Sequence, residues 1–323
     1  IKRVLPPEIM IQALKFDPAK RILSIGNNKY NISKGRIFVV GGGKASGLMA
    51  ETLEKILGPT NITGGVINCI DKSYTTNKIE IIEASHPTPD MRGVTGVARM
   101  LSLKERFSIN KDDLVICLIS GGGSALLPCP VDGISLAAKQ EITKQLVKSG
   151  AAIHETNAVR KHLSKIKGGG LGRFFSPAQV VSLILSDVIG NNLDVIASGP
   201  TAPDRSTFSG AYRVLEKYGL LSAAPLSVIE YIKKGCRGEV KETPKELDNC
   251  YNHIIGDNRA ALDAIAEKSR QLDFRPYIVT AEQTGDPADM AKLRVKEILA
   301  GKYRDHDVIL IGASEQDFLD DQL

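Results

Sequence analysis

Two runs of three glycines, each directly after a stretch of β-forming apolar residues, are the segments of this sequence best suited to chemistry. The first run consists of Gly41, Gly42 and Gly43. The second run, with a serine on either side, gives Ser120, Gly121, Gly122, Gly123 and Ser124. Glycine lets a backbone approach a ligand closely, and free N–H groups at a helix start favour negative charge. We therefore expect both loops to bind anions, although glycine after a parallel strand also makes ordinary tight turns.

Lys44 follows the first glycine run directly and is the leading candidate for a catalytic cation. A lysine at a helix N-terminus opposes the helix dipole, so a nearby anion is expected to compensate its charge. The alternative is an exposed lysine in the first turn of a helix. The spacing does not match a Walker A loop. It is also a poor dinucleotide fingerprint, because Gly47 stands one position beyond the place where the third glycine belongs.

Two aspartates follow the buried strand expected at Val180–Leu185. A carboxylate at a strand end, such as Asp187, can hold Mg²⁺ or accept the proton of a substrate hydroxyl, as phosphoryl transfer requires. The alternative for both aspartates is an Asx turn or a helix cap. For Asp187 the sequence favours function. Asp194 precedes a short apolar run, which favours the structural role, and it is kept as a candidate binding residue.

Five cationic residues lie within eight positions, more than the capping of a helix end requires. They are Arg160, Lys161, His162, Lys165 and Lys167. With a helix expected over Glu155–Ile166, Arg160, Ser164 and Lys167 would share one face. We expect Arg160 and Lys167 to meet a substrate carboxylate or phosphate. The alternative is that these cations only complement the negative end of the helix.

Two stiff turns carry further polar groups. His86–Asp90 contains two prolines, each of which forces the preceding residue into extended geometry. The second turn places the hydroxyls of Ser198 and Thr201 on either side of Gly199-Pro200. Either turn can line a pocket or serve as plain connection, and Ser198 and Thr201 are kept as candidate binding residues. The sequence has no G-x-S-x-G elbow, and its few histidines do not favour a zinc site.

Composition narrows the class of protein. The net charge of +5 is carried by residues spread through the chain, and tryptophan is absent, so nucleic-acid binding is not expected. No apolar stretch reaches the roughly 18 residues of a membrane span. No secretory signal is recognised at residues 1–10. The five cysteines form no C-x-x-C pair, which predicts neither a zinc site nor a disulfide framework and favours the cytoplasm.

The expected elements alternate between strands and helices. Three continuous apolar strands, at Ile37–Val40, Leu114–Ile119 and Val180–Leu185, indicate burial on both faces and thus a mostly parallel sheet covered by helices. Shorter strands are expected at Gly65–Cys69 and Ile79–Glu83. The expected helices between and after these strands are Pro7–Leu14, Ala45–Leu57, Thr95–Arg106, Leu136–Ser149, Glu155–Ile166 and Ser209–Tyr218. Ligands bind at the carboxyl ends of such strands, where both glycine loops fall.

Residues 233–250 are charged and poor in apolar residues, which predicts a linker. We expect an α/β fold with two domains: a three-layer, Rossmann-like α/β/α domain over residues 1–240 and a smaller α/β domain over 241–323. The second unit begins with a strand at Tyr251–Ile255 and continues with the helices Arg259–Leu272 and Asp286–Leu299. An α/β domain rarely stops soon after a strand such as Asp307–Ile311, so we expect this second domain to be incomplete.

Taken together, five segments resemble the class II glycerate 2-kinase family. They are Val39–Ala45, His86–Asp90, Ser120–Leu126, Val159–Gly170 and Leu185–Thr201, which span roughly residues 37–220 in the family's order. The resemblance implies ATP- and Mg²⁺-dependent phosphorylation of D-glycerate, usually at the 2-hydroxyl. It places the family's essential lysine on Lys44 and its strand-end aspartate on Asp187, which would orient or deprotonate the substrate hydroxyl or bind Mg²⁺. The family's second catalytic cation, an arginine of the C-terminal domain, has no counterpart in this sequence.

Two other functions stay open at this point. Members of the family have also carried the label of NAD(P)H-dependent hydroxypyruvate reductase, against which the imperfect dinucleotide fingerprint argues. A non-catalytic module that binds a sugar phosphate through the serine–glycine loop is the third possibility. D-glycerate and ATP are the expected partners, with no nucleic acid and no membrane, and a homo-oligomer is left open. Which glycine loop holds which anion is equally open.

Overall fold

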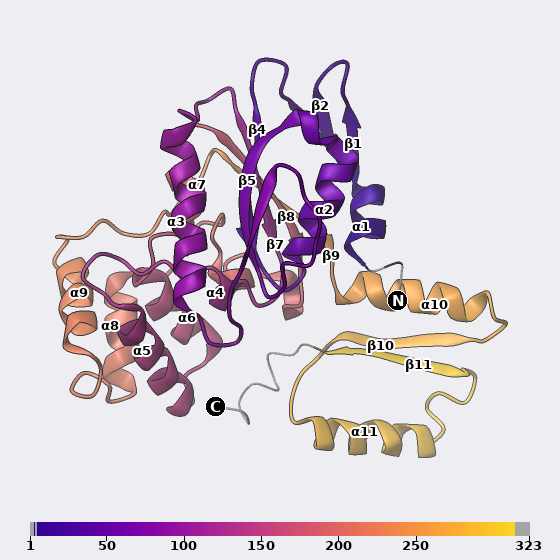
Figure 1. Ribbon diagram of the computed structural model, residues 1–323. Helices are drawn as coiled ribbons and strands as arrows, with labels where there is room; N and C mark the ends of the chain where they lie inside the picture. The colour runs from indigo at the N-terminus through magenta and orange to yellow at the C-terminus, as the bar shows by residue number, and fades with distance from the viewer. Residues whose placement is uncertain (1–2, 4, 314–323) are drawn as a thin grey trace.

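The computed structural model, which describes residue 3 and residues 5–313, has a parallel six-stranded sheet at its centre (Figure 1). The strand order is β6-β5-β4-β7-β8-β9, and every neighbouring pair is parallel. The strands are β4 Ile37–Gly42, β5 Ile62–Cys69, β6 Ile79–Glu83, β7 Leu114–Ile119, β8 Gln179–Leu185 and β9 Cys250–Gly256. The carboxyl ends of all these strands therefore meet at one edge of the sheet.

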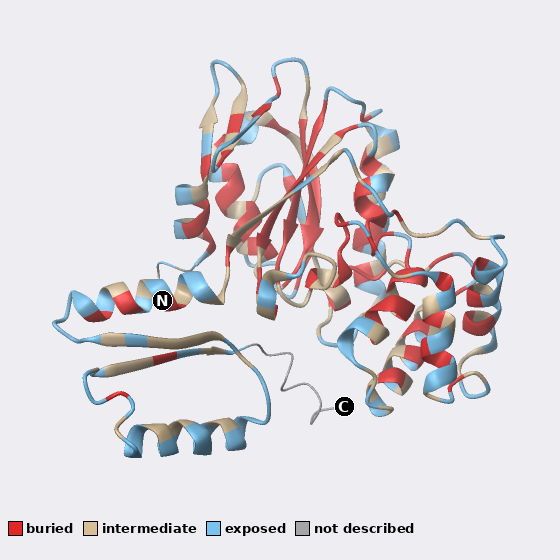
Figure 2. Ribbon diagram, turned by 180° about the vertical axis from the view of Figure 1, so that it is seen from behind, coloured by how far each residue is buried: buried red, intermediate tan, exposed pale blue. Residues whose placement is uncertain are grey.

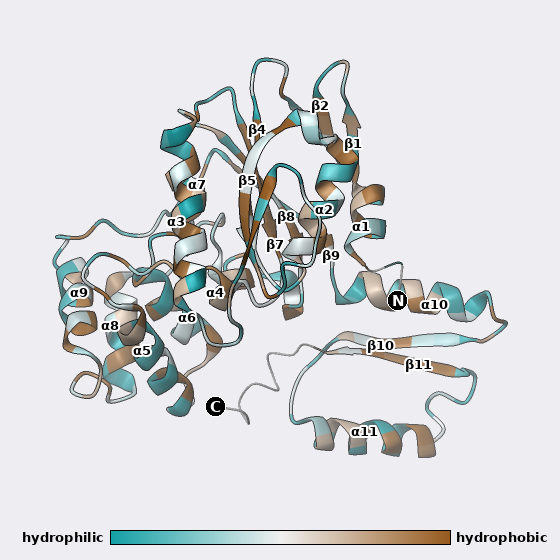
Figure 3. Cartoon of the chain, viewed as in Figure 1, coloured by the Kyte–Doolittle hydropathy of each residue, from teal (hydrophilic) through white to brown (hydrophobic). Residues whose placement is uncertain are grey.

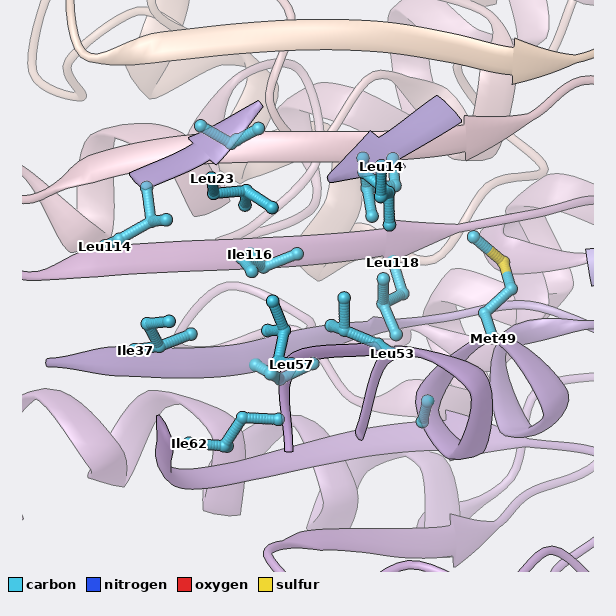
Figure 4. Packing of buried hydrophobic residues seen from close by; sticks show 14 of the residues in the cluster. Leu14, Leu23, Ile37, Met49, Leu53, Leu57, Ile62, Leu114, Ile116 and Leu118 are labelled. Atoms are coloured by element: carbon cyan, nitrogen blue, oxygen red, sulfur yellow. The ribbon is translucent and has the colours of Figure 1, made fainter. Parts of the chain in front are cut away.

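One face of the sheet is covered by α1 (Pro6–Ala13), α2 (Ser46–Leu57) and a small antiparallel sheet. That sheet, which the sequence did not predict, contains β1 (Leu14–Asp17), β2 (Ile22–Ile25) and β3 (Asn28–Asn31). Figure 4 shows the resulting core, in which α2 places Met49, Leu53 and Leu57 over the sheet strands. Leu53 is fully buried, as are Ile116 and Leu118 of β7.

The opposite face is covered by α3 (Met91–Arg106) and α7 (Gly170–Phe175). Their apolar side chains form a second cluster with the other face of the same strands, including Met100 and Phe175. Figure 2 shows the buried residues concentrated on the central strands and on the inner sides of these helices. The predicted three-layer α/β/α arrangement with a parallel sheet is confirmed.

A group of helices with its own apolar core lies beyond the carboxyl edge of the sheet (Figure 1). Its members are α5 (Leu136–Lys148), α6 (Ile153–His162), α8 (Phe208–Lys217) and α9 (Leu226–Cys236), and the short α4 (Gly123–Leu126) follows β7 directly. Short 3-10 turns occur at Pro59–Asn61, Ile189–Asn191 and Ile196–Ser198. Among the described residues, no helix has the length and apolar character that crossing a membrane demands.

Helix α6 is shorter than predicted. It ends at His162, whereas the sequence predicted helix as far as Ile166. Beyond it, Ser164 forms an antiparallel bridge with Pro130, and the Lys165 N–H donates to the Cys129 carbonyl at 2.9 Å. These contacts with the segment after α4 replace the next helical turn. The expectation that Arg160, Ser164 and Lys167 share one helix face is therefore wrong.

The last part of the described chain forms a small α/β unit. Helix α10 (Asn258–Arg270) packs on a separate parallel pair, β10 (Pro276–Gln283) and β11 (Val308–Ala313), and α11 (Pro287–Leu299) connects these strands. No residue of α11 is buried, and its apolar Leu293, Val295, Ile298 and Leu299 are exposed, as Figures 2 and 3 show along this helix. The described residues thus leave one side of this unit uncovered.

The division expected at residue 240 stays a prediction. Strand β9 lies beyond that position, yet it hydrogen-bonds to β8 as the last strand of the large sheet. The expected linker over residues 233–250 is also only partly irregular, because α9 extends to Cys236. The chain between α9 and β9 thus leads from the helical group to the last strand of the large sheet.

Candidate functional site

The two triple-glycine loops lie against each other at the carboxyl edge of the sheet. Strands β4 and β7 are neighbours in register, with Gly42 opposite Ile119, so their following loops emerge side by side. The Lys44 N–H donates to the Gly121 carbonyl at 2.8 Å, and the Ala45 N–H donates to Ser120 Oγ at 3.0 Å. Because these N–H groups at the start of α2 are engaged within the protein, the first loop presents the Lys44 side chain rather than a backbone cradle.

Glycine is required in the first loop by the closeness of this contact. Gly41 has a φ of +132°, and a Cβ there would lie 2.1 Å from the Leu118 carbonyl oxygen. Gly43 has a φ of +155°, and its Cβ would lie 2.2 Å from Ser120 Oγ. Both positions combine a left-handed backbone with a neighbour too close for any side chain. These glycines hold the two loops together.

The second loop is surrounded by three ionisable side chains from three different strand ends. A Cβ on Gly121 would lie 1.9 Å from Asp187 Oδ2. A Cβ on Gly122 would lie 3.0 Å from Lys44 Cγ and 2.8 Å from His86 Cδ2. Lys44, His86 and Asp187 are all half-buried, so each packs against the loop while remaining open to solvent on one side. The structure thus brings the two predicted catalytic residues to the same glycine turn.

The backbone of this turn is arranged differently from that of the first loop. Gly122 has a φ of +79° and precedes the short α4. Within the described part of the chain, no backbone–backbone hydrogen bond uses the N–H group of Gly121 or of Gly122. This half-buried turn is therefore the better candidate for holding an anion by its backbone.

Ser124 and Ser198 form the next layer of the site. Their hydroxyls lie 2.7 Å apart, and Ser198 Oγ donates to Asn157 Oδ1 at 3.3 Å. Lys167 Nζ donates to the Ser124 carbonyl at 2.9 Å, which fixes this buried lysine beside the second glycine loop. The predicted residues Ser124, Lys167 and Ser198 are thus brought together, although Lys167 comes from the segment after α6 and not from the helix itself.

A cluster of three cations lies beside this layer. It comprises Lys139, Arg160 and Lys167. Burial, and then the neighbouring Arg160, lower the pKa of Lys139 to about 7. The pKa of Lys167 is lowered well below its ordinary value by burial and by both other cations. Among the described residues, none of the three forms an ion pair with a carboxylate, so an anion bound beside them would favour their charged forms, which burial disfavours.

Residues 1–233 match the family described as "Domain of unknown function (DUF4147)". The chain belongs to this family. It is 41% identical over 291 residues to a protein of Pyrococcus horikoshii named "Glycerate 2-kinase", covering 90% of this chain and 64% of that one. A Thermotoga maritima protein named "D-glycerate 2-kinase" is 38% identical over 271 residues, covering 84% of this chain and 62% of that one. This DUF4147 chain therefore spans less than two thirds of the length of these relatives.

Solved structures agree with the fold. A crystal structure from Pyrococcus horikoshii matches with a TM-score of 0.82 at 38% identity, covering 97% of this chain and 71% of that one. A Thermotoga maritima crystal structure named as glycerate kinase matches with a TM-score of 0.80 at 34% identity, covering 97% of this chain and 70% of that one. A protein of Agrobacterium vitis, 37% identical over 260 residues, covers 79% of this chain and 64% of its own length and is named "Putative hydroxypyruvate reductase".

Two predicted binding residues of this DUF4147 chain bond to groups outside the glycine turn. Asp194 Oδ2 accepts a hydrogen bond from Lys161 Nζ at 2.9 Å, and the same amine reaches Asp204 Oδ1 at 3.2 Å. The buried hydroxyl of Thr201 lies 2.7 Å from Ser182 Oγ and 2.7 Å from Asn252 Oδ1. Both side chains already have protein partners, which supports a structural role for each.

Sequence reasoning missed Lys139. It lies on the inner face of α5 with Ile142 and Leu146, where helical spacing predicts an apolar residue. Its ammonium group donates to the Leu163 carbonyl at 3.2 Å, just beyond the end of α6. A charged residue on the apolar face of an amphipathic helix was the signal that could have found it.

Proposed function

We propose that this protein transfers a phosphoryl group from ATP to D-glycerate and forms 2-phosphoglycerate. The observation that carries the proposal is the meeting of Lys44 and Asp187 at the Gly121–Gly122 turn, on the carboxyl edge of a parallel sheet. Relatives that bear the name of glycerate kinase support the choice of substrate. The reaction involves two anions, a carboxylate and a triphosphate. Within the described residues, the site offers both a glycine turn whose Gly121 and Gly122 N–H groups make no backbone–backbone hydrogen bond and a cluster of buried cations.

The residues of the chain would contribute mainly by positioning and by charge. Lys44 would neutralise negative charge on the transferred phosphoryl group or on the glycerate carboxylate. Asp187 would orient the acceptor hydroxyl or take its proton. The Gly121–Gly122 turn would hold one anion, and Arg160 with Lys167 would hold the other. Which of the two anions, the triphosphate or the glycerate carboxylate, binds at the turn and which binds at the two cations is left open.

Mg²⁺ is the expected metal, and the residues of the site fit an ion that is held by one protein carboxylate together with substrate phosphates and waters. Within residues 5–313, no group of three or more His, Cys, Asp or Glu side chains could hold a metal ion. Mg²⁺ is commonly bound by one or two carboxylates together with substrate phosphates and waters, so Asp187 would serve as its protein ligand. The ion would neutralise phosphate charge when bound.

Hydroxypyruvate reduction is the alternative, because some relatives carry that name. A dinucleotide pyrophosphate would need the N–H groups at the first turn of the helix after the glycine loop. In this chain the N–H groups of Lys44 and Ala45 donate to Gly121 and Ser120 instead. This geometry favours the kinase over the reductase. A cytoplasmic location remains a prediction, and whether the protein forms a homo-oligomer stays open.

A pair of assays with one protein sample separates the functions. The protein is incubated with D-glycerate, ATP and Mg²⁺, and ADP release is followed; a parallel sample receives hydroxypyruvate and NADH. Glycerate-dependent ADP release supports the kinase, and phosphorus NMR of the product distinguishes 2- from 3-phosphoglycerate. NADH oxidation without ADP release would overturn the proposal. Binding of D-glycerate or phosphoglycerate with neither reaction would instead indicate a non-catalytic module.

A further inference from the structure

The segment that carries His86 crosses the sheet to reach the glycine turn. It follows β6, the edge strand, whereas Gly122 follows β7, which lies three strands away in the order β6-β5-β4-β7. At about 4.8 Å per strand, this is a path of roughly 14 Å across the carboxyl edge. The His86 ring therefore contacts a loop three strands away instead of packing against its own element. A function at the glycine turn would explain this placement.

Both ends of this crossing segment are anchored. The Ala84 N–H donates to the Cys69 carbonyl at 2.8 Å, at the end of β5. Asp90 accepts the Gly93 N–H at 3.0 Å and thereby caps α3. Gln140 Nε2 of α5 donates to the Pro89 carbonyl at 2.7 Å. The polypeptide on each side of His86 is thus held to the sheet, to α3 and to the helical group.

The ring itself faces the same glycine as Lys44. A Cβ on Gly122 would lie 3.0 Å from His86 Nε2 and 3.0 Å from Lys44 Cγ. Only glycine, with a φ of +79° at this position, lets both side chains come so close to the backbone. His86 is half-buried, and the neighbouring Gly121 contacts Asp187 in the same way. A small anion seated on the turn would be within reach of all three side chains.

We propose that His86 is a substrate-binding residue, whose Nε2–H donates a hydrogen bond to an oxygen of the acidic substrate held over Gly122. The proposal rests on the proposed function for the identity of that substrate, a small hydroxy acid. The imidazole supplies a directional donor, whereas the lysine supplies charge without fixed direction. His86 thereby fixes the orientation of the acceptor molecule, and Lys44 and Asp187 act on the reacting oxygen.

Two variants separate hydrogen bonding from packing. His86→Gln keeps an N–H donor at about the reach of Nε2, and His86→Phe keeps the ring but removes the donor. We expect His86→Phe to raise the KM for D-glycerate roughly 10- to 100-fold, the loss expected for one hydrogen bond to a charged group. His86→Gln should recover most of this loss, and the KM for ATP should change little. Near-normal KM in His86→Phe would overturn the proposal.

A second measurement does not depend on turnover. His86 is modified with diethylpyrocarbonate, with and without D-glycerate or inorganic phosphate, and the exposed His154 serves as the internal control. Slower modification of His86 alone in the presence of either anion supports the proposal. If the rate of modification of His86, like that of His154, is the same with and without the anion, the proposal is overturned, even if the protein is an active kinase. Protection by phosphate in a protein without kinase activity would overturn the proposed function and keep the role of His86.

Discussion

Asp187 lies against the backbone of Gly121, so close that a single added methyl group would stand 1.9 Å from its carboxylate oxygen Oδ2. The loop after β8 therefore approaches the loop after β7 at a point where no side chain of the glycine loop intervenes. This contact couples the identity of a glycine to the position of the candidate catalytic aspartate. A substitution at Gly121 can therefore displace the Asp187 side chain while Asp187 itself stays unsubstituted.

Gly121→Ala is the variant that uses this contact. The new methyl group must displace the Asp187 carboxylate, which is the end of a short side chain and can move without disturbing the core. We expect kcat to fall about 100-fold, the scale of losing a positioned general base, while the melting temperature changes little. Gly64→Ala is the matched control, because its Cβ would meet only Phe107 at 3.8 Å. Wild-type kcat in Gly121→Ala would show that Asp187 needs no fixed position.

Lys44→Ala tests the candidate catalytic cation. We expect kcat to fall by about a thousandfold, because charge on the transferred group would lose its neutralising partner in a partly buried site. Lys55→Ala serves as the control on the same helix, since its ammonium group is exposed and pairs with the side chain of Glu51 at the surface. Circular dichroism and thermal melting check that both variants fold. Activity near that of the wild type would make Lys44 a structural residue.

The sheet was predictable because its buried strands are continuous apolar runs. Leu114–Ile119 and Ile79–Glu83 were predicted with both ends correct. The antiparallel strands β1 to β3 were missed, although the Gly26-Asn27 pair between Ile25 and Asn28 is a hairpin signal. The end of α6 could not be read locally, because the bridge from Ser164 to Pro130 depends on a distant segment.

The site shows the same division between local and distant information. Lys44 and Asp187 were found because glycine loops and polar residues at strand ends are visible in sequence, and strand order then placed them together. The use of the Lys44 N–H by Gly121 was not visible, because it depends on which strands are neighbours. Lys139 looked like one more lysine of an amphipathic helix, and only the packing of α5 on α6 buries it.

The buried ion pair between Lys161 and Asp204 predicts an acid-sensitive contribution to stability. Burial raises the pKa of Asp204, but Lys161 and the Ser206 hydroxyl lower it more, so the net pKa is below the ordinary value. Because its pKa is lower in the folded state, Asp204 stabilises the protein at pH values above its pKa in the unfolded chain, which is about 3.9. This stabilisation is lost as the pH falls through the pKa of the folded state. Acidification below about pH 4 should therefore weaken the fold through this group.

Asp204→Asn should lower the free energy of unfolding by about 3 kcal/mol at pH 7, at the low end for breaking a buried pair because Asp194 still faces Lys161. The loss should shrink as the pH falls below about 4 and through the lower pKa of the folded state, where the wild-type carboxylate takes up its proton as well. Urea unfolding at several pH values measures both effects. Asp132→Asn is the control, since its exposed pair with Lys165 should contribute well under 1 kcal/mol. A pH-independent difference would contradict the assignment.

Lys139→Met should make the protein more stable and the site less able to bind an anion. With a pKa of about 7 in the folded state and about 10.4 in the unfolded state, Lys139 is protonated only in the unfolded chain between these values. Stability from this group therefore rises with pH from about 7 to 10.4, and at lower pH its buried charge opposes folding beside Arg160. Methionine fills the same space without the charge and should raise the melting temperature by a few degrees, about 2–4 °C for each kcal/mol.

An added anion should reverse the expected order of melting temperatures of the wild type and Lys139→Met. Phosphate or D-glycerate bound at the cation cluster would stabilise the charged form of Lys139, so the wild-type melting temperature should rise more on adding phosphate at pH 6 than at pH 9. Lys139→Met should lose most of that increment at pH 6. Lys144→Met, an exposed substitution on the same helix α5, should keep it. An undiminished increment in Lys139→Met would mean that the anion binds elsewhere, because only a ligand that contacts the cluster can offset a charge buried inside it.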